Sequence, residues 1–330
     1  MDLVLKEKVD LMTENYKKLK EGFKWDMNLI RHFGAMIHAI KGQKVNVEAL
    51  DRIKRHIKDE TTWGSNFRGT NSFILANFLY FEDDYKNTFS NMEKVYEKMR
   101  TEGFRNSTYL PLGAYTIAKE VPIEQWDYRI KRMRHFYDNM KKNHFWLTSA
   151  DDYVFSAVLG VTDLEVEETS KKIEGCYSLL NEKGFYKGND LQTLSHILAL
   201  GEEEVNVKCN KAMKLYEGLK KNKIKLQYSG LASLGVLTLI TSDVDKVINE
   251  IKEVYDYIYE KDGYGYWSLD KNMRVILAAN LVADYYVEGI KNGVLQVALA
   301  NSINAILIAQ QQAALAAACA ASTAAASTAN

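Results

Sequence analysis

Two aspartates and one histidine in the middle of the chain are residue types that acid–base chemistry uses. Asp152 lies in LTSADDYVF at residues 147–155, and Asp190 and His196 lie in FYKGNDLQTLSHILAL at residues 185–200. A carboxyl group or an imidazole transfers protons efficiently when its pKa lies near the working pH. Asp152, Asp190 and His196 are therefore the candidate catalytic residues of this chain.

Each of these residues also has a structural explanation, which we favour. Ser149 and Asp152 are three residues apart at a predicted helix start, a spacing close to that of a capping box. Asn189 or Asp190 can cap the next predicted helix in a similar way. A single histidine on an apolar helix is more often a hydrogen-bonded core residue than a ligand or a base.

The chain contains no motif that is specific for a reaction. HExxH and GxSxG are absent, and the three cysteines have no CxxC spacing. The turn WGSNFRGTNS at residues 63–72 is polar and offers Arg68 to an anion, yet it lacks the spacing of a phosphate-binding loop. The sequence indicates no metal site and no cofactor, and we lean towards a protein that is not an enzyme.

An internal repeat supplies the elements that would position these residues. VYEKMRTEGF at residues 95–104 returns as CYSLLNEKGF at residues 176–185, each on a helix whose apolar residues recur every three to four positions. Five copies of this apolar stripe have a central tyrosine, and these tyrosines are separated by 41, 40, 39 and 39 residues. Two weaker copies precede them. The central residues of the seven copies are Tyr16, Ile57, Tyr96, Tyr137, Tyr177, Tyr216 and Tyr255.

Each copy of the repeat predicts a helical hairpin. A short break, often with glycine, follows the amphipathic helix and suits a left-handed C-terminal cap. A second, more apolar helix follows, as at residues 109–118 and 231–240. Because one hairpin cannot bury its apolar face alone, neighbouring hairpins must stack. The sequence predicts an all-α fold of about seven hairpins of roughly 40 residues, stacked as an α/α superhelix or toroid, and leaves open which of the two forms.

The repeat ends near Gly289, where the composition changes to alanine. Residues 1–289 are therefore predicted to form a single α/α repeat domain, and residues 290–330 an Ala-rich C-terminal helix with a frayed tail. We expect this helix to cap the last hairpin, with packing on a partner or on a second copy of the chain as the alternative. Glutamine and asparagine side chains within it argue against a membrane span.

The charges of the chain are balanced, with 43 basic and 43 acidic side chains. This balance gives no overall attraction to nucleic acid or to an anionic membrane. We interpret the densest basic run, RIKRMRHFYDNMKKNH at residues 129–144, as the solvated face of an amphipathic helix. The N-terminus has no signal-peptide pattern and the cysteines suit a reducing compartment, so we expect a cytoplasmic protein.

Polar residues at equivalent places in successive hairpins are predicted to line one common surface. Repeat proteins present their turns and inner helices along one face, so a partner would bind there. The candidate binding residues are Arg68, Arg105, Thr148, Asp152, Asp190, Gln192, Tyr228 and Asp270.

Three stretches carry a resemblance to a known family: LTSADDYVFSAVLG, LQTLSHILALG and AILIAQQQAALAAA. With them the chain resembles domain of unknown function 4003, a family of uncharacterised proteins from low-GC Gram-positive bacteria. The likeness runs along nearly the whole chain, including the alanine-rich end. It implies a cytoplasmic, single-domain bacterial protein, and it brings no activity, cofactor or catalytic residue.

The sequence thus favours a non-catalytic interaction or scaffold module that binds another protein or associates with itself. The alternative is an enzyme or small-molecule binder that uses the centre of an α/α toroid, with Asp152, Asp190 and His196 as its first acid–base candidates. A deep closed cavity with two facing carboxylates would favour the enzyme. An open groove, above all one filled by the C-terminal helix, would favour the scaffold.

Overall fold

The computed structural model describes residues 1–227 and 230–287. Within these residues the chain forms fourteen α-helices, one short 3-10 helix and no strand, which confirms the predicted all-α fold. None of the helices described is both long and apolar enough to cross a membrane. The C-terminal helix predicted from residue 290 lies outside the described residues.

Longer amphipathic helices alternate along the chain with helices that are buried over most of their surface. The odd-numbered, amphipathic helices are α1 (Leu3–Gly22), α3 (Val47–Glu60), α5 (Tyr85–Thr101), α7 (Trp126–Asn143), α9 (Val166–Glu182), α11 (Val205–Lys221) and α13 (Val244–Tyr259). The even-numbered, buried helices are α2 (Asn28–Ile40), α4 (Thr70–Leu79), α6 (Leu110–Glu120), α8 (Asp152–Gly160), α10 (Asn189–Leu198), α12 (Gly230–Ile240) and α14 (Lys271–Val287). The 3-10 helix Ile123–Gln125 directly precedes α7.

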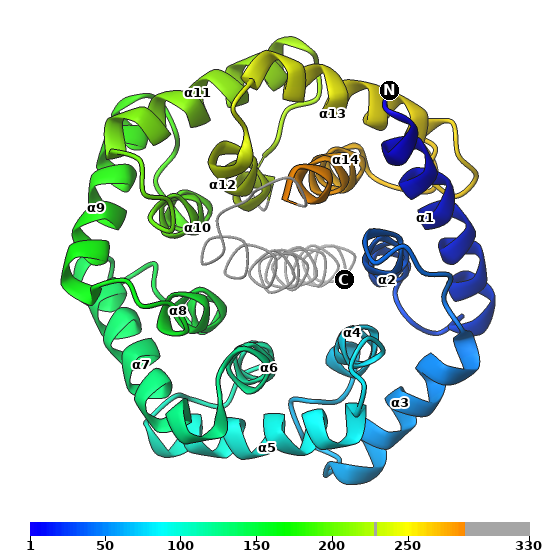
Figure 1. Cartoon of the computed structure of the whole chain (residues 1–330), viewed down its shortest axis with the longest axis vertical. Coiled ribbons are helices and arrows are strands. Elements are labelled where there is room, and N and C mark those ends of the chain that lie inside the picture. Colours follow the sequence, from blue (N-terminus) through cyan, green and yellow to red (C-terminus); the bar gives the residue numbers. More distant parts are fainter. Residues whose placement is uncertain (228–229, 288–330) are drawn as a thin grey trace, which may run out of the picture.

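The helices lie in two concentric rings, with the odd-numbered helices outside and the even-numbered helices inside (Figure 1). Each outer helix packs on the inner helix that follows it and on the outer helices to either side. α13 contacts α1, and α14 contacts both α1 and α2. The first and the last hairpins therefore lie side by side.

The inner helices are apolar on nearly every face because they pack against several other helices at once. Every residue of α8 is buried, as is every residue of α4 after Thr70. Small residues bring the helix backbones close together. A methyl group added to Gly160 would lie 2.9 Å from Cβ of Met133 on α7, and one added to Gly235 would lie 2.9 Å from a methyl carbon of Ile197 on α10.

The repeated stripe of the outer helices packs against the inner ring, as its periodicity predicts. Tyr16, Tyr96, Tyr137 and Tyr177 are buried, whereas Tyr216 and Tyr255 are only partly buried. The break after the stripe also has the predicted left-handed conformation in four hairpins. The residues concerned are Gly103, Gly184, Lys223 and Gly263, with φ values of 96°, 104°, 60° and 86°.

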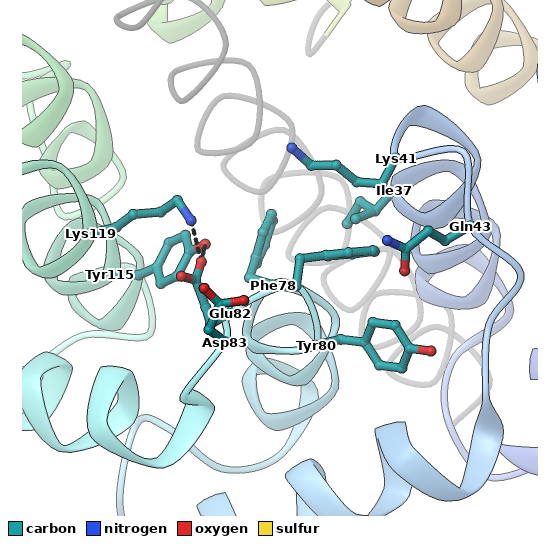
Figure 2. A pocket seen from close by; sticks show the side chains of 10 residues that line it. Ile37, Lys41, Gln43, Phe78, Tyr80, Glu82, Asp83, Tyr115 and Lys119 are labelled. Carbon is teal, nitrogen blue, oxygen red and sulfur yellow. Dashed lines mark hydrogen bonds and ion pairs between the residues drawn. The ribbon is translucent and has the colours of Figure 1, made fainter.

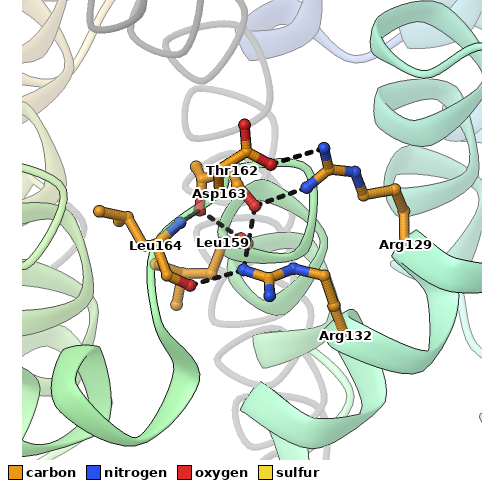
Figure 3. A network of polar contacts seen from close by, with 6 residues as sticks. All are labelled: Arg129, Arg132, Leu159, Thr162, Asp163 and Leu164. Atoms are coloured by element: carbon orange, nitrogen blue, oxygen red, sulfur yellow. Dashed lines mark hydrogen bonds and ion pairs between the residues drawn. The ribbon is translucent and has the colours of Figure 1, made fainter.

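Arg129 and Arg132 on α7 hold the loop that joins α8 to α9 (Figure 3). Arg129 donates to the carbonyl oxygen of Thr162 and to the carboxylate of Asp163, both at 2.7 Å. Arg132 Nη2 donates to the carbonyl oxygens of Thr162 and Leu164 at 3.0 and 2.5 Å. The prediction of a solvated face is wrong at these two arginines, because carbonyl groups at the end of α8 need donors from elsewhere.

Candidate functional site

The inner helices are seen end-on in Figure 1 and run side by side along the axis of the ring. Because every hairpin is built in the same way, the loops that lead from each outer helix to its inner helix lie together at one end of the ring. Hydrogen bonds join neighbouring loops. Asn71 Nδ2 donates to the Thr108 carbonyl oxygen at 2.7 Å, and Asn28 Nδ2 donates to the Ser268 carbonyl oxygen at 3.1 Å. We call this end the loop rim, and its described residues are 23–27, 61–69, 102–109, 144–151, 183–188, 222–227 and 260–270.

Tyrosines of the repeated stripe fix the position of these loops. The hydroxyl of Tyr16 donates to Asn28 Oδ1 at 2.7 Å, at the first residue of α2. The hydroxyl of Tyr177 accepts from the backbone N–H of Gly188 at 3.2 Å, just before α10. The hydroxyl of Tyr96 bonds to Asn106 in the loop before α6. The same residue that packs the hairpin therefore also anchors the loop above it.

Aromatic side chains project from the loop rim into solvent. Their exposed fractions are 98% for Trp25, 92% for Trp63, 92% for Trp146, 94% for Tyr186 and 94% for Trp267. We call these five residues the aromatic rim. They include four of the five tryptophans of the sequence, although tryptophan is normally a largely buried residue. Among the residues that the structure describes, these side chains are not buried by their neighbours, so they are candidates for contact with a partner.

Five inner helices, α2, α4, α6, α8 and α10, begin at the loop rim without the side-chain caps that most outer helices have. Met27, Gly69 and Gly188 precede α2, α4 and α10, and none of them forms a side-chain bond to the first turn. The prediction that Asn189 or Asp190 caps α10 is wrong, because the helix already begins at Asn189. Uncapped helix N-termini carry partial positive charge, which attracts carboxylates and other anions.

Asp152 is a buried carboxyl group at the start of α8, only 4% exposed. Its Oδ2 accepts from the backbone N–H of Ser149 at 2.9 Å, one of the two bonds of the predicted capping box. The Ser149 hydroxyl instead bonds to Asp151. Burial, reinforced by the charge of Asp151, raises the pKa of Asp152 to about 8. Asp152 is therefore protonated in most molecules at neutral pH.

Asp151 couples Asp152 to the neighbouring hairpins. Asn189 Nδ2 donates to Asp151 Oδ2 at 3.3 Å. Burial and then the charge of Asp151 raise the pKa of Asp190, and burial with both aspartates raises the pKa of Tyr109 to about 12. The structure thus brings Asp152 and Asp190 into one cluster, in which a protonated carboxyl group lies beside an acceptor.

His196 does not belong to this cluster. It is 2% exposed on α10, packs against the ring of Phe155 with a centroid separation of 5.9 Å, and neither ring nitrogen has a hydrogen-bond partner. The predicted hydrogen bond to His196 is therefore wrong. Burial and then the charge of His144 lower the pKa of His196 to about 3, so the ring stays neutral at physiological pH. Its acid–base role is not supported.

The other candidate binding residues have different surroundings, although all those described lie on the loop rim or in the first turn of an inner helix. The backbone N–H of Arg105 donates to Tyr153 Oη at 3.2 Å, and its side chain is exposed. Gln192 Nε2 donates to the buried hydroxyl of Thr148 at 3.1 Å. Asp270 accepts from the N–H of Asn272 at 2.7 Å at the start of α14. Tyr228 lies outside the described residues.

Arg68 is committed to the end of α3. Its Nε donates to Thr61 Oγ1 at 3.1 Å, and its Nη2 donates to the carbonyl oxygens of Lys58 and Thr61. Cations are favourable at a helix C-terminus, where carbonyl groups lack partners. The predicted anion-binding guanidinium therefore also has a structural role, which leaves Nη1 outside these three bonds.

A hollow of 420 Å³ lies at the opposite ends of α2, α4 and α6, away from the loop rim (Figure 2). Glu82 accepts a hydrogen bond from Tyr115 Oη at 2.9 Å and forms an ion pair with Lys119. These bonds tie α6 to the end of α4. No residue that the sequence singled out lies in this hollow.

The described residues contain no group of three or more histidine, cysteine, aspartate or glutamate side chains placed to hold a metal ion. Cys176 and Cys209 are free and buried. The Cys209 thiol lies 3.9 Å from the carbonyl oxygen of Cys176.

Comparison with known proteins places the chain among bacterial relatives. It is 27% identical over 322 residues to "Uncharacterized protein YeaA" of Bacillus subtilis (strain 168), and the match covers 94% of this chain and 93% of that protein. No solved structure matches. The family described as "Protein of unknown function (DUF4003)" matches residues 15–312, and the chain therefore belongs to this family, as the three resembling stretches predict.

Proposed function

We propose that this chain is a closed α/α toroid of seven hairpins that acts as a non-catalytic interaction module and binds a polypeptide on its loop rim. The observation that carries the proposal is the aromatic rim, five side chains that are 92–98% exposed, each in a loop that leads from an outer helix to its inner helix. Tryptophan and tyrosine are the residues that most often dominate the energy of protein interfaces. Their large rings contribute buried area, and their N–H and O–H groups bond at the edge.

The surroundings of the aromatic rim favour a polypeptide partner with apolar and acidic side chains. A cavity of 220 Å³ opens beside Tyr186, with Lys187 and Lys225 in its lining. An apolar side chain of the partner would fill this cavity while the two lysines attract a neighbouring carboxylate. The balanced charge of the whole chain disfavours nucleic acid as the partner. Self-association through the same surface would use the same contacts.

We place this activity in the cytoplasm. Free buried thiols at Cys176 and Cys209 suit a reducing compartment.

The test is to replace three aromatic rim residues and follow one defined partner. Full-length protein with Trp25→Ser, Trp146→Ser and Trp267→Ser would be compared with wild type after crosslinking in the native host. The control variant changes three exposed apolar residues outside the loop rim, Ile123→Ser and Val207→Ser together with Leu3→Ser, which are 60%, 51% and 68% exposed.

We expect one polypeptide to crosslink to the loop rim of wild type and of the control variant, and to be lost from the aromatic variant. The Kd of the purified pair should rise at least about 100-fold, since each buried aromatic anchor contributes about 2 kcal/mol or more. Equal circular dichroism spectra and melting temperatures would show that the variants are folded. An unchanged Kd in the aromatic variant would refute the proposal.

A second candidate function rests on Asp152. A carboxyl group with a pKa of about 8 beside Asp151 and Asp190 can donate a proton at neutral pH, as a general acid does. In that case native mass spectrometry of the protein from its own host should show a retained small molecule. Asp152→Asn should lose that molecule, whereas the aromatic variant should keep it. A bound molecule that survives Asp152→Asn would rule this function out.

A further inference from the structure

A second cavity lies on the outer side of the second hairpin, between α3 and the loop before α4. Its volume is 540 Å³, which is within the range of pockets that hold small ligands. The turn at residues 63–72 forms one wall, and the last two turns of α3 form the other. The sequence singled out this turn for its glycines and its arginine. The fold explains the hydrogen bonds of Arg68 to the end of α3, but not the exposure of Trp63.

Positive charge exceeds negative charge in this cavity. Lys54, Arg55, Lys58 and Arg68 line it together with the carboxylate of Asp51. Arg55 pairs with Asp51 at 2.8 Å, and Lys54 pairs with Asp26 at 2.6 Å from outside the lining. Lys58 and Arg68 have no carboxylate partner among the residues that the structure describes. The cavity therefore keeps two positive charges that an anionic ligand would neutralise.

The guanidinium of Arg68 is held in place before any ligand arrives. Three hydrogen bonds to Thr61 and Lys58 use its Nε and Nη2. Nη1 takes no part in them, and Arg68 is one of the residues that line the cavity. A donor that is already fixed loses little entropy when it binds, and arginine matches the geometry of phosphate oxygens.

The N-terminus of α4 also opens onto the cavity. Gly69 precedes the helix with φ of 64°, a conformation that favours glycine, and it supplies no side-chain cap. No heavy atom lies within 4 Å of the position that its Cβ would occupy. The start of α4 therefore has no side-chain cap from Gly69, and uncapped helix N-termini attract phosphate groups.

Trp63 supplies a flat apolar surface at the same cavity and is 92% exposed. An aromatic base stacks on such a ring, while phosphate groups need cations and N–H donors. We infer that this cavity binds a free nucleotide, with its base on Trp63 and its phosphates against Lys58, Arg68 and the start of α4. This site shares Trp63 with the aromatic rim but would serve a different ligand, and the inference does not depend on the polypeptide proposal.

Isothermal titration of the full-length chain with ADP tests the inference, with adenosine and inorganic pyrophosphate as separate probes. We expect ADP to bind with a Kd below roughly 1 mM, and each of the other two to bind more weakly because it has only one half of the contacts. Lys58→Glu should weaken ADP and pyrophosphate by about 10-fold or more, the effect of losing one charge-assisted hydrogen bond. Trp63→Ala should weaken ADP and leave pyrophosphate unchanged.

Matched substitutions elsewhere separate this site from general charge and stacking. Lys142→Glu removes an exposed lysine of α7, and Trp25→Ala removes a tryptophan that is 98% exposed on another hairpin. Both should bind ADP as the wild type does. The inference is overturned by an absence of ADP binding at millimolar concentration, by binding that survives Lys58→Glu, or by tighter binding of an adenine oligonucleotide than of ADP. None of these outcomes depends on the polypeptide partner.

Discussion

Replacing Asp152 with asparagine should stabilise the protein at neutral pH and leave its stability unchanged near pH 4. The pKa of this carboxyl group is raised from an ordinary value of 3.8 to about 8 in the folded protein, chiefly by burial. A group whose folded pKa is raised stabilises the fold below the unfolded pKa, and this contribution is lost as the pH rises towards the folded pKa. Asparagine has no proton to lose, so Asp152→Asn removes that loss.

The size of the stability difference between Asp152→Asn and wild type follows from the pH interval. Each unit of pKa shift corresponds to about 1.4 kcal/mol, so roughly three units between pH 4 and pH 7 give about 4 kcal/mol in favour of the variant. The difference should level off above pH 8. A competing effect is the attraction of an ionised carboxylate to the N-terminus of α8, which contributes only about 0.3–1 kcal/mol. The cost of burying the ionised carboxylate is therefore the larger effect, and the variant should be the more stable protein at pH 7.

Urea unfolding followed by circular dichroism at pH 4.5, 6, 7 and 8.5 measures the difference. The wild-type curve alone is not enough, because the lowered pKa values of His32 and His196 make stability rise with pH over the acidic range. This contribution cancels between wild type and variant. Asp245→Asn, at an aspartate whose side chain is 73% exposed and pairs with Lys214, serves as the control and should change stability by less than about 1 kcal/mol at every pH. A variant that is less stable than wild type at pH 7 would refute the reasoning.

Three further pairs of substitutions test the packing. Tyr177→Ala should lower the free energy of unfolding by about 3–5 kcal/mol because the ring is buried. Tyr177→Phe should lower it by about 1 kcal/mol because the hydroxyl makes one hydrogen bond. A loss below about 1 kcal/mol for the alanine variant would show that the stripe is not part of the core. Gly160→Ala should cost about 1–3 kcal/mol because the new methyl group meets the α7 backbone, whereas Gly64→Ala, with open space around it, should be neutral in the same denaturation assay. Arg132→Ala should cost about 1–3 kcal/mol in urea unfolding, because the Leu164 carbonyl oxygen loses this donor while Thr162 keeps only its bond from Arg129; Arg105→Ala should change little.

The repeat could be predicted from the sequence because each hairpin packs against its neighbours in the same way. Tyrosines such as Tyr96 and Tyr177 recur at one position since a buried ring and a loop anchor are needed once per hairpin. Gly103 and Gly184 recur because the chain turns there with positive φ. These requirements involve residues close together in the sequence, so residue type and spacing are enough to predict them. The contact of α13 and α14 with α1 is set by the small rotation between hairpins, which no single residue encodes.

The candidate site was harder to predict because burial decides its chemistry. Asp152 and Asp190 have the same side chain, yet Asp152 is buried at the helix start and Asp190 only partly so. His196 has no partner for its ring nitrogens, which spacing along the helix does not reveal. The aromatic rim did leave a signal. In Phe185-Tyr186 a buried aromatic is followed directly by an exposed one, and only a position that is not needed for packing tolerates the second ring.

The way the loop rim is built explains how it can present side chains without losing its shape. The loops are held from below by tyrosine hydroxyls of the stripe and from the side by bonds such as Asn71 to Thr108. These anchors use buried or backbone groups, whereas the side chains of Trp25 and Trp146 are 98% and 92% exposed, so under the proposed function they can contact a partner without disturbing the loops. A rigid loop with free aromatic side chains binds with less loss of conformational entropy than a mobile one. Removing one of these hydrogen bonds should therefore weaken partner binding even where every aromatic side chain is intact. Tyr16→Phe tests this, because it removes the hydroxyl that donates to Asn28 and leaves the aromatic rim unchanged.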